Sequence, residues 1–194
     1  KKNVELTEKH GLVVIAKMQT SGRGRAGRKF ISIPNNNLTF SVVLHPHLPS
    51  KDIQVFSLLA GIVVARVLEN YIDGIKLKWP NDVLVNGKKI CGILIETNFS
   101  IGQTYPSLIM GIGLNIKGLL KDYPNELQDI LTTMEEEILR NSYTNDKYQS
   151  RKLPKIEKIF QEILAELENC FHKFTGNFQK NINLKNTDMN RALL

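Results

Sequence analysis

Three short runs of strand-forming residues follow one another between positions 75 and 97, and they limit the fold more than any other feature. The turn sequence Trp-Pro-Asn at 79–81 separates the first two runs. Asn86-Gly87, the preferred dipeptide of a two-residue type I′ hairpin, separates the second and third. Strands joined by turns this short pair in antiparallel fashion, because a parallel partner needs a crossover of about a dozen residues or more. This segment therefore favours an antiparallel or mixed sheet.

Apolar periodicity predicts the other elements of the chain. Runs rich in apolar and β-branched residues predict strands at 12–18, 38–44 and 105–116. Apolar positions at helical spacing predict helices at 51–71, 125–137 and 153–174, and residues 1–9 are typical of the end of a helix. Hairpin-linked strands surrounded by helices predict an α+β fold, with a mixed, largely antiparallel β-sheet and packed helices.

Length and composition fit one domain. The chain has 194 residues, 42% of them hydrophobic, which is enough to bury a core. We expect a domain at 1–174, then a polar tail or the truncated start of a C-terminal segment at 175–194. The first residue is not Met, so upstream residues are expected to be missing. Two cysteines make no disulfide framework and no signal peptide or membrane-length apolar run is present, so we expect a cytoplasmic protein.

A Gly-x-Gly-x-x-Gly pattern, Gly22, Gly24 and Gly27, follows the first predicted strand. A dinucleotide-binding fold would need an amphipathic helix opening at these glycines and an acidic residue about 20 positions further on. The chain instead runs into Pro34 and an Asn-rich turn, and His-Pro-His stands near position 45. The dinucleotide interpretation therefore fails.

The same loop suits a small anion in another way. Its glycines leave backbone N–H groups free to form an anion-binding nest, and Arg23, Arg25 and Arg28 offer planar donors for phosphate. Of the net charge of +7, residues 1–30 contribute +6, with eight Lys or Arg against two Glu. The remainder shows no basic stripe, so a small anion is favoured over a nucleic acid. A solvated basic loop without function stays open on this stretch alone.

Further along, polar residues interrupt strand-forming segments. Lys-Trp-Pro-Asn-Asp at 78–82 places three polar groups at a strand junction, where Pro80 removes a ladder donor. Lys-x-x-Gly-Ile-Leu follows at 89–94, and Gly-Ile-Gly-Leu-Asn at 111–115. Glycines in these strands allow close approach of the backbone to another group. Together these stretches favour a ligand site over the alternative, a plain loop in which Asp82 is a capping residue and Trp79 belongs to the core.

In this order, GRGRAGR, KWPND, Lys-x-x-Gly-Ile-Leu and GIGLN resemble the biotin protein ligases over about residues 12–116. The resemblance implies a fold related to class II aminoacyl-tRNA synthetases and lipoate ligases. It implies biotin and ATP as substrates, Mg²⁺ with the ATP, and a biotin carboxyl carrier protein of acetyl-CoA carboxylase or a related carboxylase as acceptor. Biotin would be activated as biotinyl-5′-AMP and then transferred to a carrier lysine.

The resemblance also implies roles for individual residues. The catalytic residues it implies are Arg25, Lys89 and Asp82. The biotin-binding residues are Gln19, Gly22, Arg23, Lys89, Gly92, Ile93 and Leu94. The nucleotide-binding residues are Arg23, Gly24, Arg25, Phe30, Lys78, Asn81 and Asn115. Arg25 would retain the adenylate, Lys89 would contact the reacting carboxylate and phosphate, and Asp82 would orient or deprotonate the incoming lysine. No protein metal site is implied with certainty.

The chain departs from the family pattern in a few places. Phe30 stands where members usually have Trp, and the Ser-Thr-Asn segment that helps bind biotin is absent. No helix-turn-helix precedes the catalytic part, so DNA binding is not expected, and neither is membrane binding. A homodimer stays an open alternative. Rival functions are a lipoate or octanoate ligase or transferase of the same fold, or a non-catalytic anion-binding module.

Other reactive residue types have simpler explanations. His45 and His47 flank Pro46 and are expected in a surface turn, since a metal site would need further ligands. Cys91 lies in an apolar strand without an evident activating base and is expected in the core. Glu135 to Glu137 are expected to form a solvated helix face.

Overall fold

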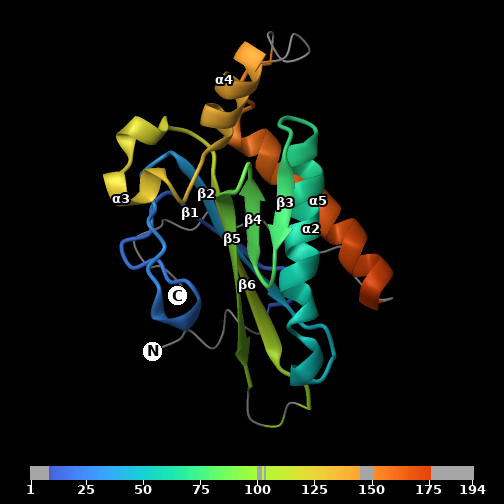
Figure 1. Ribbon diagram of the computed structural model, residues 1–194. Helices are drawn as coiled ribbons and strands as arrows, with labels where there is room; N and C mark the ends of the chain where they lie inside the picture. Colours follow the sequence, from blue (N-terminus) through green and yellow to red (C-terminus); the bar gives the residue numbers. More distant parts are fainter. Residues whose placement is uncertain (1–8, 100–101, 103, 145–150, 176–194) are drawn as a thin grey trace.

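The computed structural model describes residues 9–99, 102, 104–144 and 151–175. A six-stranded sheet in the order β1-β2-β6-β5-β4-β3 forms its centre, and all five pairings in the described part are antiparallel (Figure 1). The strands are β1 Val13–Ala16, β2 Asn37–Leu44, β3 Ile75–Lys78, β4 Asp82–Val85, β5 Lys88–Asn98 and β6 Ser107–Asn115. The α-helices are α2 Val55–Glu69, α3 Asn125–Gln128, α4 Met134–Thr144 and α5 Ile156–Thr175. The predicted α+β class with a largely antiparallel sheet is confirmed.

The three strands expected between 75 and 97 form consecutive hairpins. Asn86 and Gly87 have φ angles of 50° and 85°, the left-handed pair that a type I′ turn requires. The β3–β4 turn holds Trp79, which is 76% exposed, so the only Trp of the chain is not a core residue. Ser57 Oγ of α2 donates a hydrogen bond to the Pro80 carbonyl at 3.1 Å and ties this turn to the helix layer.

Two helices cover one face of the sheet. In Figure 1, α2 and α5 run side by side on one side of the strands, while the loop of residues 19–33 and α3 lie on the other. α2 is apolar on most of its sides because it packs against both the sheet and α5. α5 is amphipathic and turns one apolar stripe inward, as its spacing predicts.

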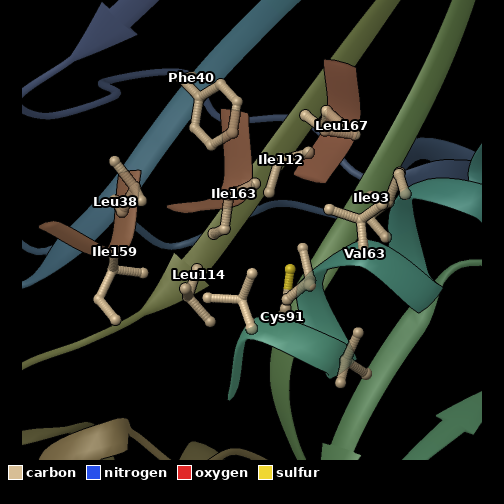
Figure 2. Close-up of a cluster of buried hydrophobic side chains, with 14 of the residues drawn as sticks. Leu38, Phe40, Val63, Cys91, Ile93, Ile112, Leu114, Ile159, Ile163 and Leu167 are labelled. Carbon is tan, nitrogen blue, oxygen red and sulfur yellow. The ribbon is translucent and has the colours of Figure 1, made fainter. Parts of the chain in front are cut away.

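The core lies between the sheet and these helices. Every second residue of the central strands points to this face, as strand geometry requires. Figure 2 shows side chains from β2, β5 and β6 meeting side chains from α2 and α5. The labelled residues are Leu38, Phe40, Cys91, Ile93, Ile112, Leu114, Val63, Ile159, Ile163 and Leu167. The alternate residues of the same strands are thereby turned to the opposite face, which α2 and α5 do not cover.

The predicted helix at 125–137 is wrong as a single element. α3 ends at Gln128, and α4 begins only at Met134. The residues between leave the helical path because Leu131 forms a parallel bridge with Lys89 of β5, and Thr133 Oγ1 accepts the Glu136 N–H at 3.0 Å as a helix N-cap. The bridge to Lys89 and the new N-cap at Thr133 thus outweigh the helix propensity of residues 129–133.

The expected solvated face at Glu135 to Glu137 is also wrong in part. Glu137 is 0% exposed. The Glu135 carboxylate accepts the Gly118 N–H at 2.7 Å, and that of Glu136 accepts the Leu120 N–H at 3.2 Å. The start of α4 therefore uses its carboxylates to satisfy the backbone of the preceding loop.

The expected turn at His45 and His47 is partly exposed. His47 is exposed, and His10 Nδ1 accepts the His45 N–H at 2.9 Å, while burial lowers the pKa of His10. The described residues contain no group of three or more His, Cys, Asp or Glu able to hold a metal ion. Among them, no helix is long and apolar enough to cross a bilayer. Residues 1–8 of the predicted N-terminal helix end lie outside the described residues, and so does the predicted tail at 175–194 apart from Thr175, the last residue of α5.

Candidate active site

A single cross-strand row forms the centre of the sheet face opposite α2 and α5. Pairing aligns Thr39 of β2 with Gly113 of β6, Gly113 with Gly92 of β5, Gly92 with Asp82 of β4, and Asp82 with Lys78 of β3. Residues paired across adjacent strands point to the same face. The two central positions carry no side chain, so the row forms a trough with polar groups at both sides.

Lys89 reaches this trough through a β-bulge. Val83 pairs with Cys91 but Leu84 pairs with Lys89, so β5 has one extra residue at this point. Without the extra residue, Lys89 and Gly92 would point to opposite faces, because three positions separate them. The bulge therefore places the lysine on the face that carries Gly92.

Lys89 and Asp82 form an ion pair in the trough. Lys89 Nζ lies 2.7 Å from Asp82 Oδ1. That oxygen is buried and has no hydrogen-bond partner of good geometry among the described residues, so the ammonium is its compensating charge. A Cβ on Gly92 would lie 3.0 Å from both Cε and Nζ of Lys89. Gly92 therefore leaves room for the lysine side chain in this position, which a larger residue would displace.

The glycine–arginine loop folds into a narrow hairpin above the trough. Phe30 N donates to Gly22 O at 2.9 Å, and Gly24 N donates to Arg28 O at 2.7 Å. The Phe30 ring lies on Gly113, where a Cβ would be only 2.4 Å from the ring. Arg23 lies 3.8 Å from Glu96 of β5. The Phe30 ring thus anchors the loop on the sheet.

We predict that Gly22→Ala opens this loop whereas Gly24→Ala does not. A Cβ at Gly22 would lie 2.5 Å from the Phe30 carbonyl oxygen, and backbone cannot yield as a side-chain end can. At Gly24 the nearest atom is 3.5 Å away, an ordinary contact. Hydrogen exchange of the Phe30 amide should accelerate about tenfold or more in the first variant. Equal exchange in both variants would show that Gly22 does not close the loop.

The loop and the sheet together enclose a hollow of about 520 Å³, within the usual range for small-molecule sites. Six cationic side chains and two acidic ones stand among the described residues that line it. The cationic residues are Arg23, Arg25, Arg28, Lys29, Lys78 and Lys89. Such an excess of donors suits an anionic ligand, in particular one that carries phosphate.

Of the residues expected in the site, all but Gly22, which is buried, line this hollow. Gln19, Leu94 and Lys78 line it directly. Asn81 is tied to β5, since its Nδ2 donates to the Ile93 carbonyl at 2.8 Å and its carbonyl accepts the Ile93 N–H at 3.0 Å. The Ile93 side chain points into the core and is 2% exposed, so only its backbone can face a ligand (Figure 2).

Asn115 lies two residues beyond Gly113 on β6, lines the hollow and is already hydrogen-bonded. Its Oδ1 accepts Asn37 Nδ2 at 2.8 Å, and its Nδ2 donates to the Thr132 carbonyl at 3.0 Å. Asn37 Oδ1 in turn accepts the Ile33 N–H at 2.7 Å. The side-chain amide of Asn115 therefore holds three segments together at this end of the site.

Sequence reasoning missed two parts of the site. Thr39 and Ser41 line the hollow, and alternation along β2 with the apolar Leu38, Phe40 and Val42 could have revealed them. The segment 129–131 also lines the hollow beside Lys89. No sequence signal points to it, because its place depends on a pairing with a distant strand.

Cys91 is predicted to be unreactive in the folded protein. Burial, with a smaller contribution from Asp82, raises the pKa of the Cys91 thiol to about 12, while Lys89 opposes the shift. A pKa raised in the native state stabilises the protein below the thiol's unfolded pKa, and this contribution is lost as pH rises toward 12. Iodoacetamide at pH 8 should therefore label Cys91 only after unfolding. Labelling of Cys91 in the native protein, read by peptide mass spectrometry, would contradict its burial.

One protein-family model and several curated proteins match this chain in sequence. The model of the Biotin/lipoate A/B protein ligase family matches residues 1–115. The "Bifunctional ligase/repressor BirA" of Bacillus subtilis is 39% identical over 128 residues, which make up 65% of this chain and 39% of that relative's length. The "Biotin--[acetyl-CoA-carboxylase] ligase" of Mycobacterium tuberculosis is 37% identical over 111 residues, which make up 55% of this chain and 40% of that relative. The chain thus spans about two fifths of the length of these curated relatives.

Solved structures agree over more of the chain. The biotin protein ligase from Aquifex aeolicus in complex with biotin and ATP matches with a TM-score of 0.70 at 29% identity, covering 91% of this chain and 68% of that one. The Leishmania major biotin protein ligase in complex with biotinyl-5-AMP matches with a TM-score of 0.60 at 25% identity, covering 91% and 76%. The similarity in fold therefore extends well beyond the part matched by the family model.

Proposed function

The chain belongs to the Biotin/lipoate A/B protein ligase family, and on that basis we propose that it catalyses ATP-dependent attachment of biotin to a lysine of a biotin carboxyl carrier protein. The observation that carries the proposal is the Lys89–Asp82 pair, 2.7 Å apart in a glycine-floored trough beneath an arginine-bearing loop. Relatives named as biotin ligases, and a relative bound to biotin and ATP, support it.

The first step joins two anions, and the cationic hollow suits that task. A biotin carboxylate oxygen attacks the α-phosphorus of ATP, the bond to the β-phosphate oxygen breaks, and pyrophosphate leaves with its electron pair. Negative charge collects between the carboxylate and the phosphate. Lys89, fixed in the trough, neutralises this charge without reorganisation, which is the largest single contribution in many active sites.

The second step transfers biotin to an amine. The ε-amine of the carrier lysine attacks the carbonyl of biotinyl-5′-AMP, loses a proton, and AMP leaves. Asp82 is the carboxylate nearest to Lys89 in the trough and would orient this amine or accept its proton. Asn81 and Lys78 border the same turn and support Asp82 in position. The hairpin of residues 22–30 excludes water from the reactive anhydride.

We assign the two substrates to two parts of the hollow. Gln19, Gly92 and Leu94 line the part assigned to biotin, and Gly22 lies beside Gln19 in the loop above it. Phe30, with Arg25 and the distant Asn115, borders the part assigned to the nucleotide. ATP would enter as its Mg²⁺ complex, with the ion held through phosphate oxygens, since Mg²⁺ commonly binds through substrate phosphates and few carboxylates. A cytoplasmic location, a homodimer and the absence of DNA binding stay predictions.

A biotin-dependent pyrophosphate-exchange assay tests the first step. The protein, ATP and labelled pyrophosphate should yield labelled ATP only when biotin is present, and lipoate or octanoate should not replace it. Exchange with lipoate or octanoate but not with biotin would show that the chain is a lipoate or octanoate ligase of the same fold. Transfer is tested separately by adding an apo carrier domain and probing for bound biotin. Absence of exchange with any of the three acids would contradict an activating enzyme.

A further inference from the structure

A buried carboxylate that the proposed reaction does not use lies behind the nucleotide end of the site. Glu137, near the start of α4, is 0% exposed. Its Oε1 accepts the Thr132 hydroxyl at 2.6 Å, and its Oε2 accepts Asn86 Nδ2 at 2.9 Å. Arg140, one turn further along the helix, donates to Oε1 at 3.3 Å. Both carboxylate oxygens are therefore hydrogen-bonded.

Thr132 belongs to a segment whose backbone is hydrogen-bonded to both the N–H and the carbonyl of Lys89. In the 129–132 segment, the Ile130 carbonyl accepts the Lys89 N–H at 2.8 Å, and the Thr132 N–H donates to the Lys89 carbonyl at 2.9 Å. These bonds form a parallel bridge next to the β-bulge that turns Lys89 into the trough. The backbone of the central lysine is thus held from the 129–132 segment as well as from β4.

The same segment also orients Asn115. The Thr132 carbonyl accepts Asn115 Nδ2 at 3.0 Å. The Asn115 side chain continues through Asn37 to the Ile33 N–H, at the end of the loop above the trough. Hydrogen bonds therefore connect Glu137, through Thr132, to Asn115 on β6 and, through Asn37, to the loop above the trough.

The second carboxylate oxygen of Glu137 is hydrogen-bonded to the β4–β5 turn. Asn86 is the first residue of that turn, and its side-chain amide donates to Glu137 Oε2, whereas the Thr132 hydroxyl donates to Oε1. A buried charge is costly unless it is paired and hydrogen-bonded. An apolar residue would fill this position of α4 without that cost, but it could not join the turn to the 129–132 segment. The carboxylate is thus best explained by the two groups that it connects.

We propose that Glu137 is a positioning residue, which fixes the 129–132 segment through Thr132 and the β4–β5 turn through Asn86. It thereby sets the Lys89 backbone and the Asn115 amide at the nucleotide end of the site. The catalytic consequence rests on the proposed function. The structural consequence, stabilisation of the two Lys89–segment hydrogen bonds, does not depend on it.

Glu137→Gln and Thr132→Val test this directly. The first removes the charge and one acceptor at constant size, and the second removes only the hydroxyl. Each should raise the KM for ATP about tenfold in pyrophosphate exchange, as expected for one lost hydrogen bond to a charged group. The Kd for biotin without ATP should change less than the KM for ATP, since Gln19 and Leu94, which line the part assigned to biotin, lie outside this network. The double variant should be no worse than either single variant, because both remove the same link.

Matched controls separate positioning from general stability. Glu136→Gln removes a neighbouring carboxylate that also pairs with Arg140, at 3.8 Å, but does not contact Thr132, so it should keep the wild-type KM for ATP. Thr132→Ser retains the hydroxyl and should restore most of the affinity lost in Thr132→Val. Equal losses of ATP and biotin binding, an additive double variant, or the same effect in Glu136→Gln would each overturn the proposal.

Hydrogen exchange decides the inference independently of activity. The amides of Lys89 and Thr132 should exchange about tenfold faster in Glu137→Gln and Thr132→Val than in the wild type, while amides in the centre of α5 keep their protection. Unchanged exchange at Lys89 and Thr132 would refute the positioning role. If the wild type shows no biotin-dependent exchange of pyrophosphate, the proposed function fails, and this amide measurement still decides the inference.

Discussion

Replacing Lys89 by methionine should lower the rate of biotinyl-adenylate formation about 10²–10³-fold, the usual effect of removing one preorganised donor. The methionine side chain has nearly the length of the lysine side chain but carries no charge. The physical reason is the position of the ammonium in the trough, between the loop that carries the arginines and the buried Asp82 oxygen. Single-turnover formation of adenylate from biotin and ATP measures the effect.

Two control variants make this result specific. Lys89→Met leaves Asp82 without its counter-charge, so part of any loss could come from instability. Adding Asp82→Asn removes that charge, and the double variant should recover the thermal stability of the wild type but not its activity. Lys76→Met, an exposed lysine on β3, should keep the wild-type rate. Near-normal adenylate formation in Lys89→Met would remove Lys89 from the proposed mechanism.

Arg25→Gly should still activate biotin but release biotinyl-5′-AMP about 10- to 100-fold faster. Arg25 is exposed at the tip of the loop hairpin, where its guanidinium can close over a bound phosphate. A charge-assisted contact of this kind is worth roughly 1.5–3 kcal/mol, and its loss appears in the dissociation rate. Released adenylate acylates lysines on other proteins, which a retained adenylate does not.

The measurement uses a bystander protein. The variant is incubated with biotin, ATP and an unrelated protein, and biotin on the bystander is then detected. Arg28→Gly, which removes a cation from the same loop, should release much less adenylate, because the resemblance assigns retention to Arg25. A bystander that stays unlabelled, although the variant forms adenylate, would show that the loop is not a lid. Equal labelling by both variants would mean that any loop cation suffices.

Local patterns in the sequence predicted much of the secondary structure. The Asn86-Gly87 turn needs left-handed backbone at both positions, a requirement that those two residues meet without help from the rest of the fold. The apolar spacing in 153–174 likewise predicted α5 to within a few residues. The predicted helix at 125–137 failed because Leu131 pairs with Lys89, about 40 positions away in the chain, and no local pattern records that pairing.

The sequence by itself determined which residue types gather around the site: the glycines and arginines of the loop, the acid and the lysine of the strands. Only the tertiary structure decided how they face one another. A β-bulge turns Lys89 to the side of Asp82, strand register aligns Gly92 with Gly113, and Ile93 is turned into the core. Strand side chains alternate with a period of two, so one residue of register reverses every orientation. That register is set by contacts between distant strands, which the order of residues along one strand does not contain.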